Sequence, residues 1–175
     1  TSAGLGEPAH NKSVTYNADE GDYTLNLDVT GAKGSASGVD VLFVIDRSGS
    51  MGGYNSTLLS QVQSLLTKND GIVDKIFAKS GNKNSVAMVS FSGKAGTSTT
   101  AWYGGSSKTT FKSKVNGLTA SGGTNWTYAM VKAKELLDQK SNSGNEKVVI
   151  FMSDGKPTYS WNGWKETGNG SDTKT

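Results

Sequence analysis

The sequence predicts an α/β protein, whose main part is a doubly wound, mostly parallel sheet preceded by a β-hairpin segment. The runs 39–45, 85–91 and 147–152 are almost continuously apolar, as strands buried on both faces of a parallel sheet must be. Apolar residues recur at helical spacing between these runs. The resulting order of strand, helix, strand, strand, helix, strand is typical of an open sheet with helices on both faces.

The N-terminal segment has a different pattern. Val14 and Tyr16 precede a turn through NADEGD, and strict alternation follows it at Tyr23, Leu25, Leu27 and Val29. A period of two predicts a hairpin of half-buried strands. The small residues of GAKGSASG (31–38) indicate a junction after it. We therefore expect one segment over residues 1–37 and a second over residues 38–175.

The second segment opens with the buried strand Val39–Ile45, in which Asp40 is the one charged residue. An amphipathic stripe then predicts one long helix or two abutting helices, because its apolar residues follow helical spacing: Leu58, Leu59, Val62, Leu65, Leu66, Ile72, Val73, Ile76 and Phe77. The run 85–91 predicts a second buried strand. The more polar run 97–103 predicts an edge strand that turns back on it.

The last elements come after residue 110. A short helix is indicated by Phe111, Val115 and Leu118, and it ends at Gly117. A longer helix runs from Trp126 through the apolar residues Ala129, Met130, Ala133, Leu136 and Leu137. The run Lys147–Met152 predicts a further buried strand. The residues after it have neither an apolar strand nor a helical stripe, so we expect a loop there.

Composition excludes several kinds of chemistry. The 175-residue chain has no cysteine, which removes disulfides, thiolate metal sites and a cysteine nucleophile. Its one histidine, His10, lies some way before the predicted sheet, so a Ser-His-Asp triad has no base. A net charge of +3, with the lysines and the single arginine scattered along the chain, argues against nucleic acid. No apolar run is long enough to predict a membrane span.

Oxygen-bearing side chains gather where the predicted strands end. Asp46, Ser48 and Ser50 follow the first buried strand, and Asp154 follows the last one. Thr124 lies in the loop before the second long helix. The carboxyl ends of parallel strands meet at one edge of a sheet, so three loops are expected to converge there. Carboxylates and hydroxyls suit a hard divalent cation such as Mg²⁺, and softer metals would require sulfur or imidazole.

These motifs resemble the von Willebrand factor type A domain. DRSGSM follows an apolar strand, GGTN comes later, and SDGKPT follows a second apolar strand, over Asp40 to about Thr158. All five positions of that family's metal-ion-dependent adhesion site match: Asp46, Ser48, Ser50, Thr124 and Asp154. The preceding hairpin resembles the strands of an immunoglobulin-like domain that lead into the type A domain of the tip adhesin of Gram-positive sortase-assembled pili.

The resemblance implies a secreted cell-surface adhesin, located at a pilus tip or cell wall, and no enzyme. It implies Mg²⁺, or Mn²⁺ or Ca²⁺, and a host or extracellular-matrix protein that offers an acidic residue to the metal; a pilus backbone subunit is a further partner. One alternative is a structural pilus or wall subunit in which the metal only stabilises the fold. Another is a phosphotransferase of haloacid dehalogenase type, but Ser48 occupies the position where that chemistry needs a general acid.

Three further expectations concern single features. The strand Lys147–Met152 would be an edge that is apolar on both faces, so we expect a second segment or chain, the remainder of the same domain, to pair with it. The resemblance places Lys12 where related domains form an isopeptide bond with an asparagine. The aromatic residues Tyr159, Trp161 and Trp164 are expected either to pack on a neighbouring segment or to contact a ligand.

Overall fold

The computed structural model describes residues 9–17, 22–30, 38–53, 56–78 and 83–169, and it divides into two compact units, Thr1–Ala36 and Ser37–Thr175. The first unit contains the predicted hairpin, in which β1 (Ala9–Asn17) pairs antiparallel with β2 (Asp22–Thr30). The side chain of Lys12 lies outside the described part. Both the isopeptide bond and the immunoglobulin-like assignment therefore stay predictions.

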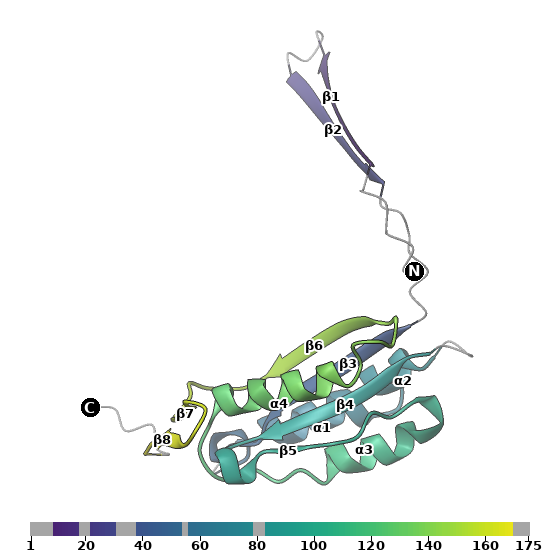
Figure 1. The fold of residues 1–175 in the computed structure, drawn as a ribbon. Coiled ribbons are helices and arrows are strands. Elements are labelled where there is room, and N and C mark those ends of the chain that lie inside the picture. The colour runs from purple at the N-terminus through teal and green to yellow at the C-terminus, as the bar shows by residue number, and fades with distance from the viewer. Residues whose placement is uncertain (1–8, 18–21, 31–37, 54–55, 79–82, 170–175) are drawn as a thin grey trace. The chain divides into compact units, whose positions relative to one another are not determined.

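The second unit is built on a four-stranded sheet (Figure 1). Its order is β5 (Ser98–Thr99), β4 (Ser85–Phe91), β3 (Val39–Asp46) and β6 (Glu146–Met152). The central strand β3 runs parallel to both neighbours, and its residues 42–45 have no exposed surface. The predicted parallel sheet is confirmed, and burial on both faces explains why alternation is missing from this strand.

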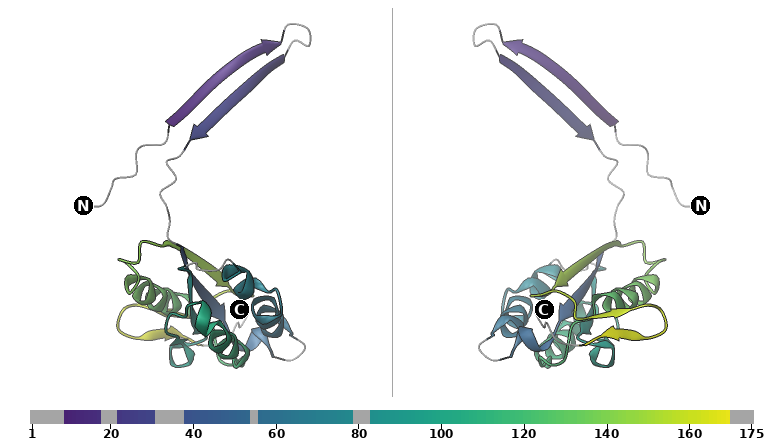
Figure 2. Two further views of the ribbon diagram at one scale, coloured as in Figure 1. Left: turned by 90° about the vertical axis from the view of Figure 1, so that its right-hand side faces the viewer. Right: turned by 90° about the vertical axis from the view of Figure 1, so that its left-hand side faces the viewer.

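One face of the sheet is covered by three helices. These are α1 (Leu58–Thr67), α2 (Ile72–Ile76) and α3 (Lys108–Asn116), and they lie on the opposite side from α4 (Figure 2). Phe43 of β3 packs against Phe111 of α3, with ring centroids 5.9 Å apart. The long apolar stripe is thus two helices, separated at Gly71. A β-carbon on Gly71 would lie 2.8 Å from the backbone carbonyl oxygen of Lys68, so this tight turn requires glycine.

The other face is covered by α4 (Trp126–Asp138). Leu42 and Val44 of β3 point to this side, whereas Phe43 and Ile45 point to the three-helix side. The small residues of α4 in the interface are Ala129 and Ala133, whose short side chains let the helix lie close to the sheet. The helix N-terminus is capped by Asn125, whose Oδ1 accepts from the backbone N–H of Tyr128 at 3.0 Å.

The two edges of the sheet differ. The predicted edge strand over 97–103 is reduced to β5, which pairs antiparallel with β4, and a separate bridge joins Tyr103 to Val86. At the other edge, β6 pairs with β3 alone among the described residues. Val148 and Val149 of β6 are 37% and 43% exposed. Among the described residues β6 is thus an edge strand with exposed apolar side chains, and its pairing with a second segment or chain stays a prediction.

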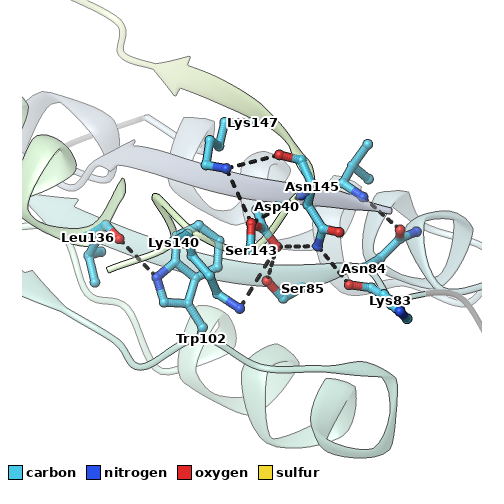
Figure 3. Close-up of polar contacts among 11 residues, drawn as sticks. Asp40, Lys83, Asn84, Ser85, Trp102, Leu136, Lys140, Ser143, Asn145 and Lys147 are labelled. Atoms are coloured by element: carbon cyan, nitrogen blue, oxygen red, sulfur yellow. Dashed lines mark hydrogen bonds and ion pairs between the residues drawn. The ribbon is translucent and has the colours of Figure 1, made fainter. Parts of the chain in front are cut away.

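A buried polar cluster lies where the strands begin (Figure 3). The Asp40 carboxylate is fully buried and accepts hydrogen bonds from Ser85 Oγ at 2.6 Å, Ser143 Oγ at 2.6 Å and Asn145 Nδ2 at 2.8 Å. Burial by itself would raise the pKa of Asp40, but these three donors, with Lys140, lower the pKa below its ordinary value of 3.8. The cluster fastens β3, β4 and the turn before β6 to one another.

The tail after β6 corrects one prediction. Instead of a plain loop, residues 159–168 form a hairpin, in which β7 (Tyr159–Trp161) pairs antiparallel with β8 (Glu166–Gly168). It is drawn in yellow in Figure 1. Three residues per strand are too few for a pattern of period two, so the sequence carried no signal for it. Within the described residues, no helix is long and apolar enough to cross a bilayer.

Candidate functional site

The first loop of the candidate site follows the central strand β3. Asp46, the last residue of β3, is fully buried, and its Oδ1 accepts the backbone N–H of Ser48 at 2.7 Å. Its Oδ2 accepts from Ser153 Oγ at 2.6 Å, so a hydrogen bond links the ends of β3 and β6. A turn of 3₁₀ helix, Gly49–Met51, carries Ser50 outward. The buried strand therefore ends in a carboxylate whose two oxygens each accept a hydrogen bond.

The predicted hydroxyl and carboxylate groups of two loops lie side by side. Ser48 Oγ is 3.2 Å from Ser50 Oγ, and Ser50 Oγ donates to Asp154 Oδ1 at 3.1 Å. Ser48 is nearly inaccessible, whereas Ser50 and Asp154 are exposed. Hydrogen bonds thus join Asp46, Ser48, Ser50 and Asp154 in one continuous series that begins inside the protein and ends at its surface.

Thr124 reaches the same edge on a third loop. Gly49 N–H donates to the Gly122 carbonyl at 2.8 Å, and the loop is fixed on its other side by a 2.8 Å bond from Asn125 N–H to the carbonyl of Ser92. Gly122 has φ +78°, which is a left-handed conformation that favours glycine. Thr124 is 5% exposed. The three predicted loops therefore meet at one edge of the sheet. Backbone hydrogen bonds of its own loop hold Thr124 there.

Arg47 forms hydrogen bonds with several of the segments around the site. Its guanidinium donates to the Gly96 carbonyl through Nη2 at 2.8 Å and to the Thr119 carbonyl through Nη1 at 2.9 Å. Its backbone N–H donates to the Phe91 carbonyl at 2.8 Å. Arg47 lies between the predicted ligands Asp46 and Ser48 and was assigned no role from the sequence. A long side chain with five donors is suited to cross-linking carbonyls of several loops, and the pattern gives no sign of it.

The donor set fits a hard divalent cation. Two neighbouring ligands of a six-coordinate Mg²⁺ lie about 3.0 Å apart when each oxygen is about 2.1 Å from the ion. The separations of 3.2 Å and 3.1 Å along Ser48, Ser50 and Asp154 agree with this spacing. The described residues hold no cluster of three or more His, Cys, Asp or Glu side chains. A cation here would rely on hydroxyls for much of its coordination, and a neutral hydroxyl offsets none of the charge of the ion.

Two aromatic residues after Asp154 differ in their surroundings: one packs on a neighbouring segment and the other is exposed. Trp161 packs edge-on against Tyr128 of α4, with ring centroids 5.1 Å apart, and Lys94 Nζ lies 4.2 Å from the Trp161 ring centroid. Trp164, near the tip of the β7–β8 hairpin, is 90% exposed. Packing is therefore confirmed for Trp161, while Trp164 presents its ring to solvent.

Comparison with known proteins gives one family and several similar structures. Residues 41–156 match the model of the von Willebrand factor type A domain. The pilus adhesin SpaC from Lactobacillus rhamnosus GG is similar, with 21% identity and a TM-score of 0.56 over 99% of this chain and 23% of that chain. The pilus adhesin RrgA from Streptococcus pneumoniae has 21% identity and a TM-score of 0.55 over 90% of this chain and 26% of its own.

A third similar structure is a von Willebrand factor type A domain from Catenulispora acidiphila, with 20% identity and a TM-score of 0.57 over 89% of this chain and 35% of that chain. No curated protein matches this sequence. At these identities the likeness is one of fold, and this chain spans less than half of each of these solved structures.

Proposed function

Because the chain belongs to the von Willebrand factor type A domain family, we propose that it is an extracellular adhesion module that binds an acidic group of a host or matrix protein through a divalent cation. Domains of this family commonly bind a divalent metal at this edge of the sheet. The proposed ligands are the five oxygen-bearing residues Asp46, Ser48, Ser50, Thr124 and Asp154. The observation that carries the proposal is the series of side-chain oxygens about 3 Å apart that links the loops after β3 and β6.

The chemistry of the ligands indicates what the partner supplies. Three of the five are neutral hydroxyls, so two carboxylates at most reduce the charge of the ion, and Asp46 uses both oxygens in hydrogen bonds to Ser48 and Ser153. If the two aspartates act partly through water, the cation remains attractive to an anion that approaches from the exposed side, where Ser50 and Asp154 lie. A glutamate or aspartate of the partner is suited to complete the coordination.

The test is a solid-phase binding screen against collagen, fibrinogen and fibronectin, run with Mg²⁺ and with EDTA. We expect binding to one of these proteins that is lost with EDTA and returns with excess Mg²⁺. Soluble glutamate-containing peptides should compete, because they offer the same carboxylate. If Mg²⁺ raises the melting temperature but no partner binds in a chelator-sensitive way, the alternative of a structural subunit in pilus or wall is favoured. Chelator-insensitive binding contradicts the proposal.

We also propose that a further segment of the same protein covers β6. Among the described residues, six of the seven large apolar side chains that are exposed lie on three elements: Leu58 and Leu65 on α1, Met130 and Val131 on α4, and Val148 and Val149 on β6. Leu58 lines a groove together with Phe151 and Met152 of β6. An apolar groove of about 680 Å³ lies between β6 and α4, lined in part by Trp126, Met130 and Phe151. Beside it the buried Nε1 of Trp126 has no hydrogen-bond partner among the described residues. Such a surface suits an apolar strand accompanied by helices.

This second proposal predicts the behaviour of the 175 residues on their own. We expect them to self-associate through β6, as seen by sedimentation velocity at increasing concentration. Val149→Lys should restore a monomer, since a charge on a strand edge blocks pairing. Thr99→Lys, at the exposed opposite edge on β5, is the matched control and should leave association unchanged. A wild-type monomer that melts cooperatively would rule the proposal out.

A further inference from the structure

Thr124 is held in place by the segment that leads from Asp154 into the β7–β8 hairpin. Its carbonyl accepts two hydrogen bonds, from the backbone N–H groups of Thr158 and Tyr159, both at 2.9 Å. Its own N–H donates to Thr158 Oγ1 at 2.9 Å. Both backbone polar groups of Thr124 are thereby bonded to two consecutive residues. The one side-chain acceptor in this arrangement is the hydroxyl of Thr158.

The fit between the Thr124 loop and the hairpin is close. A β-carbon at Gly123 would lie 2.5 Å from Tyr159 Cε2 and 2.7 Å from Thr158 Oγ1, so there is no room for a side chain between the two segments. Only three residues separate Asp154 from Thr158 along the chain. The position of Thr124 and the course of the chain after Asp154 are therefore fixed by the same contacts.

The hairpin is itself anchored to rigid parts of the fold. Glu166 Oε1 accepts from the Lys94 N–H at 2.5 Å and from Asn125 Nδ2 at 2.7 Å. Asn125 is fully buried and caps α4. Trp161 N–H donates to Thr127 Oγ1 in the first turn of α4 at 2.6 Å. These bonds hold the hairpin against α4 and the loop after β4, so the Thr158 hydroxyl is presented to Thr124 by a fixed support.

We propose that Thr158 is a positioning residue for the cation site: its hydroxyl holds the main chain of Thr124 so that the Thr124 side chain faces the cation. This inference rests on the proposed metal site. A hydrogen-bonded partner of a metal ligand typically contributes about 10-fold to 100-fold to metal affinity, because it fixes the orientation of that ligand. Thr158 is the last residue of the SDGKPT motif, but it was not among the predicted site residues.

The experiment measures Mn²⁺ affinity by electron paramagnetic resonance on the full chain. Thr158→Val keeps the shape of the side chain and both backbone bonds to Thr124 but removes the acceptor. We expect it to weaken Mn²⁺ binding about 10-fold to 100-fold. Thr158→Ser restores the hydroxyl and should bind within about threefold of the wild type. Thr167→Val is the matched control, since the Thr167 hydroxyl pairs with Ser160 inside the hairpin at 2.9 Å and does not touch Thr124.

The outcomes separate this inference from the proposed function. A wild-type chain that does not bind Mn²⁺ contradicts the metal site, and the role of Thr158 with it. A wild-type chain that binds, together with Thr158→Val of equal affinity, contradicts only the role of Thr158. So does Thr158→Ser that binds as weakly as Thr158→Val. If Thr158→Val does not fold, Gly123→Ala is measured instead. Its methyl group would push the Thr124 loop away from Thr158 and Tyr159. Unchanged Mn²⁺ affinity in Gly123→Ala overturns the inference.

Discussion

Asp46→Ala is expected to lower the affinity for Mn²⁺ or Mg²⁺ by more than about 100-fold. This loss exceeds the effect of removing a residue that only hydrogen-bonds to a metal ligand. Asp46 is one of only two carboxylates in the proposed site. Its buried side chain also orients the backbone at Ser48 and the hydroxyl of Ser153. Calorimetric titration with Mg²⁺ measures the effect directly. Thermal unfolding supplies a second readout, since metal at about 100 times its Kd stabilises the wild type by about 2.7 kcal/mol and should leave the variant unchanged.

Two further variants make the result specific to the site. Asp46→Asn preserves the shape and one acceptor oxygen, so it should fold like the wild type and still bind metal weakly. Asp138→Asn removes an equal charge from an exposed pair with Lys134 and should bind metal normally. Without metal, Asp46→Ala also loses its repulsion with Asp154, so its melting temperature is compared with that of the metal-free wild type. Unchanged Mg²⁺ affinity in Asp46→Ala would contradict the assignment.

Asp40→Ala is expected to lower the free energy of unfolding by about 3 kcal/mol, because it removes the carboxylate that accepts three hydrogen bonds within the fold. The donors are Ser85, Ser143 and Asn145, which the Asp40 carboxylate joins at the start of three strands (Figure 3). The site that we propose for the cation is at the other end of β3. Mn²⁺ affinity of the folded variant should therefore be unchanged, which distinguishes this effect from that of Asp46→Ala. Urea unfolding at neutral pH is the measurement.

The pH dependence of that stability has a definite sign. The pKa of Asp40 is lower in the folded protein than its ordinary value of 3.8. A carboxyl group of this kind contributes its full stability above the pKa of the unfolded chain, and the contribution is lost as the pH falls through the folded pKa. The difference in unfolding free energy between the wild type and Asp40→Asn should thus be constant above about pH 5 and shrink below about pH 4. A difference that grows with acid contradicts the role of the ionised carboxylate.

Sequence patterns predicted the sheet and the convergence of the loops because each depends on local spacing. The stripe through Leu59 and Leu66 and the apolar run before Asp46 are continuous signals of burial. The roles of Asp40, Arg47 and Thr158 were not predictable in this way. Asp40 is bonded to residues 45 and 105 positions away, and Thr158 to a residue 34 positions away. Polar contacts between distant segments have no period, so only the folded chain reveals them.

The proposed site has two halves with different mechanical support. Asp46, Ser48 and Ser50 follow β3, which is hydrogen-bonded along both sides, whereas Asp154 follows β6, which is bonded along one side among the described residues. Local opening at the end of β6 would break fewer strand-to-strand hydrogen bonds than opening of β3, so Asp154 would separate from a bound cation before the residues after β3 do. Release of a cation would then begin at Asp154, and its residence time would be governed by how firmly the outer edge of β6 is held.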